Sequence, residues 1–97
     1  MATFISLCTF TDQGIRTVKD TVQRADAVTD GARKFGCTLT NVFWTQGQYD
    51  LVTILDAPDE AAATAFALGV SQAGNVRFHT LRAFSRDDMQ DILAKLP

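Results

Sequence analysis

Residues 3–10, TFISLCTF, alternate two sets of side chains that are both largely apolar. Phe4 and Cys8 fall on one side of an extended chain, and Ile5 and Leu7 fall on the other. Aromatic and β-branched residues in this pattern favour a strand. Because neither side of this strand is polar, we predict that both faces of the surrounding sheet are covered.

Two later stretches carry apolar residues at steps of three or four and are predicted as helices. The first covers residues 21–35 and ends at Gly36, which accepts the left-handed conformation that closes a helix. The second covers residues 59–73 and ends at Gly74, with Asp59 as its N-cap or as an early carboxylate on the helix dipole. This second helix is apolar nearly all round, so we expect it to be buried on more than one side, either within the chain or partly against another subunit.

A β-hairpin is predicted between the helices, with strands over residues 38–45 and 49–56. Gly47 and Gln48 suit a two-residue type II′ loop, in which the first central residue needs a positive φ. The resulting register pairs Gln46 with Tyr49, Trp44 with Leu51 and Val42 with Thr53 on one face. The other face carries Leu39, Asn41, Phe43 and Thr45, so neither face of the hairpin is polar enough to lie in water.

A fourth strand is predicted over residues 75–84, and Ser85 with Asp88 forms a capping-box-like start for a short closing helix. Residues 11–20 contain turn and capping residues and are predicted as a connection. The order is therefore βαββαβ with a C-terminal helix, an α+β ferredoxin-like domain spanning residues 1–97. Two helices cover one face of such a sheet, so we predict that a second copy covers the other and that the protein is a homodimer.

The composition narrows the classes of function. The formal net charge is −2 and no run of Lys or Arg could follow a phosphate backbone, so nucleic acid is not an expected partner. No signal peptide and no apolar run of roughly 20 residues is present, which predicts a cytoplasmic protein with no membrane association. Cys8 and Cys37 are not spaced as C-x-x-C and the chain has one His, so we expect reduced thiols and no metal site.

Four ordered motifs resemble the GYD-domain family, which is named for a Gly-x-Tyr-Asp turn. The motifs are FTDQGIR, WTQGQYDLV, DAPDEAAATA and NVRFHTLRAFS, and together they extend over nearly the whole chain. The resemblance implies a ferredoxin-like fold that pairs into a dimeric α+β barrel, and it implies no settled biochemical role. Gln48 stands where the family often has Glu, and His79 stands where a small hydroxyl residue is common.

The same barrel is similar to that of several functional groups. These are cofactor-free monooxygenases of antibiotic biosynthesis, muconolactone isomerases and the effector-binding domain of leucine-responsive transcription regulators. Such a likeness concerns the fold alone, because one fold hosts many functions.

The hairpin holds three candidate residues, each with a structural and a functional interpretation. Trp44 and Tyr49 share a face in the predicted register, where they either pack or present an indole N–H and a phenol to a ligand. Asp50 directly follows the turn and either accepts a backbone N–H bond or takes part in ligand binding or proton transfer.

The fourth strand holds two more candidates. Histidine is the side chain whose ordinary pKa lies near neutrality, and His79 is either a catalytic or binding residue or a hydrogen-bonded residue at a sheet edge or subunit contact. Arg82 pairs either with a carboxylate at an interface or with an anionic ligand. Strand alternation sends His79 and Arg82 to opposite faces. Cys8 has no cationic neighbour in the sequence and is predicted to be a core residue.

These observations support three functional hypotheses. The leading one is a homodimer without a cofactor that binds a small organic molecule in its barrel or dimer cleft through Trp44, Tyr49, Asp50 and Arg82. The second is a cofactor-free isomerase or monooxygenase with His79 or Asp50 as general base. The third is a non-enzymatic interaction subunit of a larger assembly, in a dimer or a higher even-numbered oligomer, whose apolar second helix docks onto a partner.

Overall fold

The computed structural model describes all residues from 1 to 97 and contains one four-stranded antiparallel sheet. Its strands are β1 (Ala2–Phe10), β2 (Thr38–Trp44), β3 (Leu51–Ala57) and β4 (Val76–Ala83). They are arranged in the order β2-β3-β1-β4, with every neighbouring pair antiparallel. This order confirms the predicted α+β ferredoxin-like fold.

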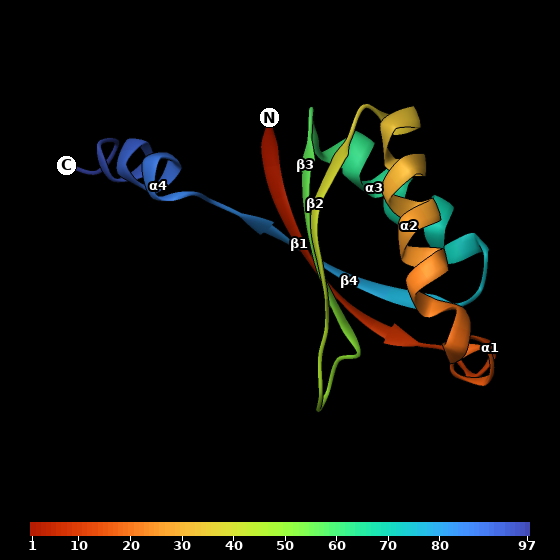
Figure 1. Cartoon of the computed structure of the whole chain (residues 1–97). Helices are drawn as coiled ribbons and strands as arrows, with labels where there is room; N and C mark the ends of the chain where they lie inside the picture. Colours follow the sequence, from red (N-terminus) through yellow and green to blue (C-terminus); the bar gives the residue numbers. More distant parts are fainter.

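The two long helices pack side by side against one face of the sheet (Figure 1). The helical segments are α1 (Asp12–Arg16), the 3₁₀ turn η1 (Val18–Asp20), α2 (Thr21–Ala32), the 3₁₀ turn η2 (Arg33–Phe35), α3 (Glu60–Gln72) and α4 (Arg86–Leu93). α1 and η1 lie in the segment that the sequence predicts only as a connection. None of the helices combines the length and the apolar character that a membrane span requires.

The predicted helix ends are confirmed by their capping geometry. Gly36 and Gly74 have φ angles of 74° and 86°, the left-handed region that favours glycine. The Asp59 carboxylate accepts a hydrogen bond from a backbone N–H in the first turn of α3. Ser85 and Asp88 form a complete capping box at the start of α4.

The core lies between the sheet and the helices α2 and α3. β1 turns Phe4, Ser6 and Cys8 towards the helices, and all three are buried. The main apolar cluster comprises Phe4, Ala32, Cys37, Leu39, Leu55, Ala57, Ala63 and Phe66. Ile5 and Leu7, on the opposite side of β1, are only half-buried. The apolar pattern of β1 predicts that both faces of the sheet are covered, and a single chain covers only one of them.

The hairpin register is confirmed in its strands and wrong in its loop. Trp44 pairs with Leu51 and Val42 pairs with Thr53, as predicted. The expected Gln46–Tyr49 pair does not form, because the loop is closed further out by the Thr45 N–H, which donates to the Asp50 carbonyl at 2.8 Å. Gly47 has a φ of 94°, which meets the predicted need for a positive angle.

An irregularity in β2 corrects the predicted place of Leu39. The ladder shifts by one residue between Leu39 and Asn41, so Leu39 pairs with Leu55 rather than facing Asp56. A shift of one residue exchanges the faces of a strand. Leu39 therefore joins the buried core, whereas the uninterrupted register placed it with Phe43.

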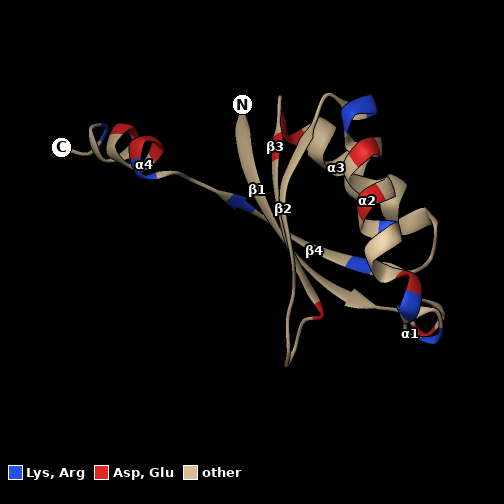
Figure 2. Ribbon diagram, in the orientation of Figure 1, with Lys and Arg blue, Asp and Glu red and all other residues tan.

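Charged residues are concentrated on the helices, while the middle of the sheet carries none (Figure 2). Asp56 on β3, with Arg77 and Arg82 on β4, are the charged residues of the four strands, and all three lie near strand ends. The central part of the sheet is therefore electrically neutral on both faces.

The N-cap and first turn of α1 anchor the segment that follows α3. The Thr11 N–H donates to the Asn75 carbonyl at 3.0 Å, and the Gln13 side-chain amide donates to the Ala73 carbonyl at 2.9 Å. Gly14 packs directly on this connection, because a Cβ at its position would lie 1.9 Å from the Asn75 carbonyl oxygen. The glycine of the motif FTDQGIR is therefore explained by its contact with Asn75. This contact joins residues far apart in the sequence, so the spacing of residues along the chain did not indicate it.

We predict that Gly14→Ala lowers the free energy of unfolding by roughly 1–3 kcal/mol or more, because the added methyl group collides with backbone that cannot rotate away. Urea denaturation monitored by circular dichroism measures the change. Gly31→Ala in α2 is the matched control, since nothing lies within 4 Å of its Cβ position, and it should raise stability by up to about 1 kcal/mol. Equal effects of the two substitutions would contradict this role of Gly14.

Candidate functional site

The face of the sheet that points away from α2 and α3 is apolar and uncovered in a single chain. Two rows of paired residues cross it, Phe43–Val52–Leu7–His79 and Asn41–Ile54–Ile5–Leu81. Phe43 and Leu81 are 52% and 45% exposed, and the central residues are half-buried. We call this surface, defined by the eight residues of the two rows, the open face.

The C-terminal residues form an arm on the same side of the sheet as the open face. α4 stands away from the body of the molecule and on the opposite side of the sheet from α2 and α3 (Figure 1). Its apolar residues Met89 and Leu93 are exposed, as is Phe84 in the connection from β4. Hydrogen bonds from the backbone and side chain of Ser85 hold the pKa of the Asp88 carboxyl below its usual range. We call residues 84–97 the arm.

Asp50 of the Gly-x-Tyr-Asp turn connects the hairpin to the end of β1. Its carboxylate accepts a hydrogen bond from the Phe10 N–H at 2.8 Å. Its own N–H donates to the Cys8 carbonyl at 2.8 Å, and its carbonyl accepts from Thr45. The carboxylate, the N–H and the carbonyl of Asp50 therefore each have a partner within the chain, which is the structural interpretation considered from the sequence.

Tyr49 and His79 meet on the open face. Their ring centroids lie 6.4 Å apart at an interplanar angle of 75°, an edge-to-face arrangement. His79 is in register with Leu7, which places it on the open face, whereas the adjacent Phe78 packs edge-to-face on Phe66 of α3. The sequence did not predict this pair, because the residues are far apart along the chain and the predicted two-residue loop sent Tyr49 to the other face.

Trp44 lies on the helix side of the sheet, so the prediction that it shares a face with Tyr49 is wrong. Its indole N–H donates to the Thr21 hydroxyl at 3.0 Å, at the start of α2, and its side chain remains partly exposed. Tyr49 and Trp44 lie on different faces because the loop is wider than predicted. Tyr49 is part of this loop rather than of a strand, so the alternation of side chains along a strand does not apply to it.

Arg82 lies at the far end of β4, on the helix side of the sheet, which confirms that it and His79 project to opposite faces. Its guanidinium stacks over Phe84 at 4.6 Å and Phe4 at 5.5 Å, and it donates to the backbone carbonyls of Thr3 and Ala83. The four predicted ligand contacts, Trp44, Tyr49, Asp50 and Arg82, are thus distributed over both faces and both ends of the sheet, and they do not converge on one site.

The two cysteines are buried free thiols, which confirms Cys8 as a core residue. Burial raises the pKa of Cys8 to about 12, and burial followed by the Asp59 charge raises the pKa of Cys37. No group of three or more His, Cys, Asp or Glu side chains is close enough to hold a metal ion.

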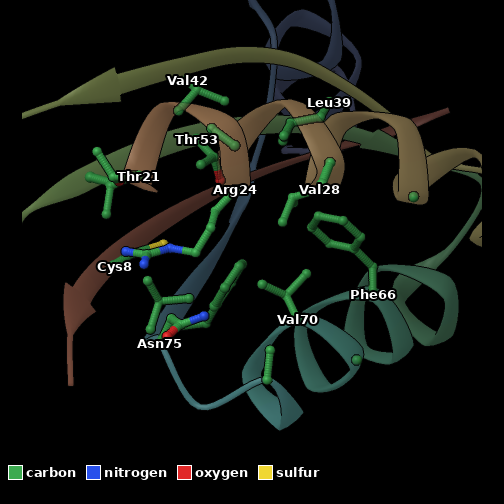
Figure 3. Close-up of a pocket in the computed structure, with 18 of the residues that line it drawn as sticks. Cys8, Thr21, Arg24, Val28, Leu39, Val42, Thr53, Phe66, Val70 and Asn75 are labelled. Atoms are coloured by element: carbon green, nitrogen blue, oxygen red, sulfur yellow. The ribbon is translucent and has the colours of Figure 1, made fainter. Parts of the chain in front are cut away.

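A cavity of about 450 Å³ lies between the sheet and the helices α2 and α3 (Figure 3). Most of its lining is apolar, including Val28, Phe35, Val42, Phe66 and Val70. The polar exceptions include Cys8, Thr21, Arg24, Thr53 and Asn75. The sequence analysis placed the ligand candidates in a barrel or dimer cleft and did not predict this cavity. The cavity depends on the distance between two helices and the sheet, which a sequence pattern does not give.

One buried polar group of this cavity has no partner. Thr53 is 7% exposed, and its hydroxyl makes no hydrogen bond. Ser6, its direct neighbour across the β1–β3 ladder, is also buried, yet its hydroxyl pairs with that of Thr80 at 3.1 Å. Buried polar groups in folded proteins nearly always have a partner, so the hydroxyl of Thr53 is an exception that requires a reason.

The order of strands, the one-sided pair of helices and the turn around Asp50 define a ferredoxin-like α+β protein with a Gly-x-Tyr-Asp hairpin. Residues 4–93 match the model of the family described as "GYD domain". The chain therefore belongs to the GYD-domain family, as the four motifs predicted. No solved structure matches the chain.

A curated relative is similar to this chain over its full length. It is the "Glutamine synthetase and cystathionine beta-lyase binding protein" of Thermus thermophilus. The two sequences are 32% identical over 97 residues, which cover 99% of each chain. The name of this relative describes a protein that binds two enzymes.

We predict that Asp50→Ala lowers the free energy of unfolding by roughly 1.5–3 kcal/mol, because the Phe10 N–H loses a charged acceptor. Asp50→Asn retains an acceptor oxygen and should cost less. Asp26→Ala, which removes an exposed carboxylate of α2, should stay within about 0.5 kcal/mol of wild type. Thermal and urea unfolding compare the three variants, and an Asp50→Ala protein as stable as wild type would contradict the anchoring role.

The raised pKa of Cys8 predicts a loss of stability at high pH. The thiol stays protonated in the native state up to about pH 12, whereas in the unfolded chain it ionises near its ordinary pKa of 9.0. The contribution of the Cys8 thiol to the free energy of unfolding is therefore complete below pH 9 and is lost as the pH rises towards 12. Wild type should therefore lose more stability over this range than Cys8→Ala, as measured by urea unfolding at several pH values. Equal losses in the two proteins would show that Cys8 ionises freely in the native state.

Proposed function

We propose that this chain is a non-enzymatic homodimeric protein whose role is to bind other proteins. The observation that carries the proposal is the open face, an apolar sheet surface that α2 and α3 leave uncovered. The full-length similarity to a relative named as a binding protein for two enzymes supports the interaction role.

The open face favours a second copy of the same chain as its cover. Burial of apolar surface contributes about 25 cal/mol per Å², and stable interfaces bury roughly 800 Å² on each partner. A two-fold pairing places the same rows against one another, so the apolar centres coincide and no charge is buried there. His79 and Tyr49 would then lie inside the dimer, at the rim of the paired sheets.

The arm supports the same pairing. An isolated helix as short as α4, which has 8 residues, is unstable in water and needs a tertiary partner. Its exposed Met89 and Leu93 have no such partner within the chain. Because the arm lies on the side of the open face, a second copy would provide the apolar surface on which α4 packs.

An interaction role agrees better with the candidate residues than a ligand site in the barrel does. Asp50, Trp44 and Arg82 are engaged within the chain, and they lie apart from one another. The enzymatic alternative with Asp50 as general base would use a carboxylate that already holds the Phe10 N–H in place. Tyr49 and His79 are the remaining pair, and a pair of aromatic rings is also an ordinary interface contact.

The outer side of α3 is the surface that we propose for the partner protein. Pairing through the open face leaves α2 and α3 on the outside of the dimer. Ala61, Ala65 and Leu68 are exposed on α3, and Leu68 is 63% exposed. Small residues beside one large apolar side chain allow another protein surface to approach the helix closely.

Two substitutions separate the dimer from the docking surface. Leu81→Asp puts a carboxylate on the open face and should weaken dimerisation at least about 100-fold, because two charges would be buried per dimer. Leu68→Glu on α3 should leave the dimer intact. Light scattering during size-exclusion chromatography, over a concentration series, measures the oligomeric state. A monomeric wild-type protein would contradict the pairing.

The interaction role is tested with purified glutamine synthetase and cystathionine β-lyase from the organism that encodes the chain. Wild type immobilised on a biosensor should bind at least one of the two enzymes, and Leu68→Glu should lose at least about tenfold in affinity. No binding of either enzyme by the intact dimer would contradict the proposal, and unchanged binding by Leu68→Glu would exclude α3 as the docking surface.

A further inference from the structure

We propose that the cavity between α2, α3 and the sheet is a binding site for a small uncharged organic molecule that carries one hydroxyl or carbonyl group. This site lies on the opposite side of the sheet from the open face. It is separate from the docking surfaces of the proposed function and does not depend on them.

The size and walls of the cavity suit an apolar body. Its volume of about 450 Å³ lies within the range of ligand pockets, roughly 300–1,000 Å³. Phe35 of η2 and Phe66 of α3 pack edge-to-face at one side, with ring centroids 6.2 Å apart. Val28 and Val70 line the cavity from the two helices, and Val42 lines it from β2 (Figure 3).

Thr53 supplies the polar contact. It lines the cavity from the middle of β3, and its hydroxyl is covered by neighbouring atoms and has no partner (Figure 3). A hydroxyl can both donate and accept, so a rotation about the Cα–Cβ bond that turns it into the cavity would let one hydroxyl or carbonyl oxygen of a guest molecule satisfy it. The paired hydroxyl of Ser6 on the neighbouring strand shows that this side of the sheet can satisfy such groups internally, and Thr53 departs from that arrangement.

The charges around the cavity indicate that the guest is neutral. Arg24 lines it, but its guanidinium donates to the Thr17 hydroxyl and carbonyl at 2.8 and 2.9 Å and to the Gly14 carbonyl at 3.3 Å. Cys8 is a protonated thiol at neutral pH because burial raises its pKa. Lys34, the other charged residue of the lining, is exposed, so water screens its ammonium group. An anion beside Thr53 would therefore lose its hydration and would have to share the Arg24 guanidinium with Thr17 and Gly14.

Three probes of the same shape test the chemical class. They are 4-propylphenol, propylbenzene and 4-propylbenzoate, which carry a hydroxyl group, no polar group and an anion. Each is titrated into the full-length protein with ¹³C-labelled methyl groups. Val28, Val42 and Val70 report on the cavity, whereas Val52 and Ile54 report on the open face. We expect 4-propylphenol to shift the cavity methyl groups at the lowest concentration and 4-propylbenzoate to bind at least about tenfold more weakly.

Two matched variants test the role of the hydroxyl. Thr53→Val keeps the shape of the side chain and should weaken 4-propylphenol binding about five- to tenfold, while propylbenzene binds at least as well as to wild type. Ser6→Ala removes a buried hydroxyl that already has a partner and does not line the cavity, so it should leave both affinities unchanged. Ala25→Leu, which fills the cavity from α2, should abolish binding of all probes.

Each of the following results would overturn the proposal. The first is the absence of cavity shifts with every probe at millimolar concentration in the folded wild-type protein. The second is a set of shifts confined to Val52 and Ile54, which would assign the probes to the open face. The third is equal loss of 4-propylphenol binding in Thr53→Val and Ser6→Ala, or tighter binding of 4-propylbenzoate. Because dimerisation and enzyme binding are measured separately, failure here leaves the proposed interaction role unaffected.

Discussion

The architecture depends on one constraint. The sheet has apolar residues on both of its faces, but the two long helices cover only one of these faces. β1 shows this directly, with Phe4 and Cys8 packed under the helices and Ile5 and Leu7 left half-buried on the other side. A polar outer face would have made the chain self-sufficient. The neutral centre of the sheet and the projecting arm are both consistent with a fold completed by another molecule of protein.

The Gly-x-Tyr-Asp turn serves the same architecture by joining elements that are distant in sequence. Asp50 binds the end of β1 through its side chain and its backbone, while Gly47 provides the positive φ that lets the chain reverse. Tyr49 is thereby directed towards His79 on the open face. A motif that names a family can therefore be explained by backbone hydrogen bonding, without any requirement for chemistry at the carboxylate.

The two sides of the sheet suit different kinds of binding partner. The open face is largely apolar and uncovered, which suits another protein surface. The helix side holds a partly open cavity with apolar walls and one unpaired hydroxyl, which suits a small molecule. Because β3 contributes Val52 to one side and Thr53 to the other, a guest in the cavity and a partner on the open face would be separated by a single layer of backbone.

The sequence by itself determined the order of the strands and long helices and the helix caps at Gly36, Asp59, Gly74 and Ser85, because periodicity, capping and turn chemistry are local. Its resemblance to the GYD-domain family rested on four motifs, and the family model confirms it. It could not determine the width of the hairpin loop or the shift at Leu39, since both depend on which backbone groups find partners on another strand. The meeting of Tyr49 with His79, the contact of Gly14 with Asn75, and the unpaired hydroxyl of Thr53 were decided only by the tertiary structure. Each of these three features depends on whether residues that are distant along the chain lie close together in space. Packing in three dimensions decides that.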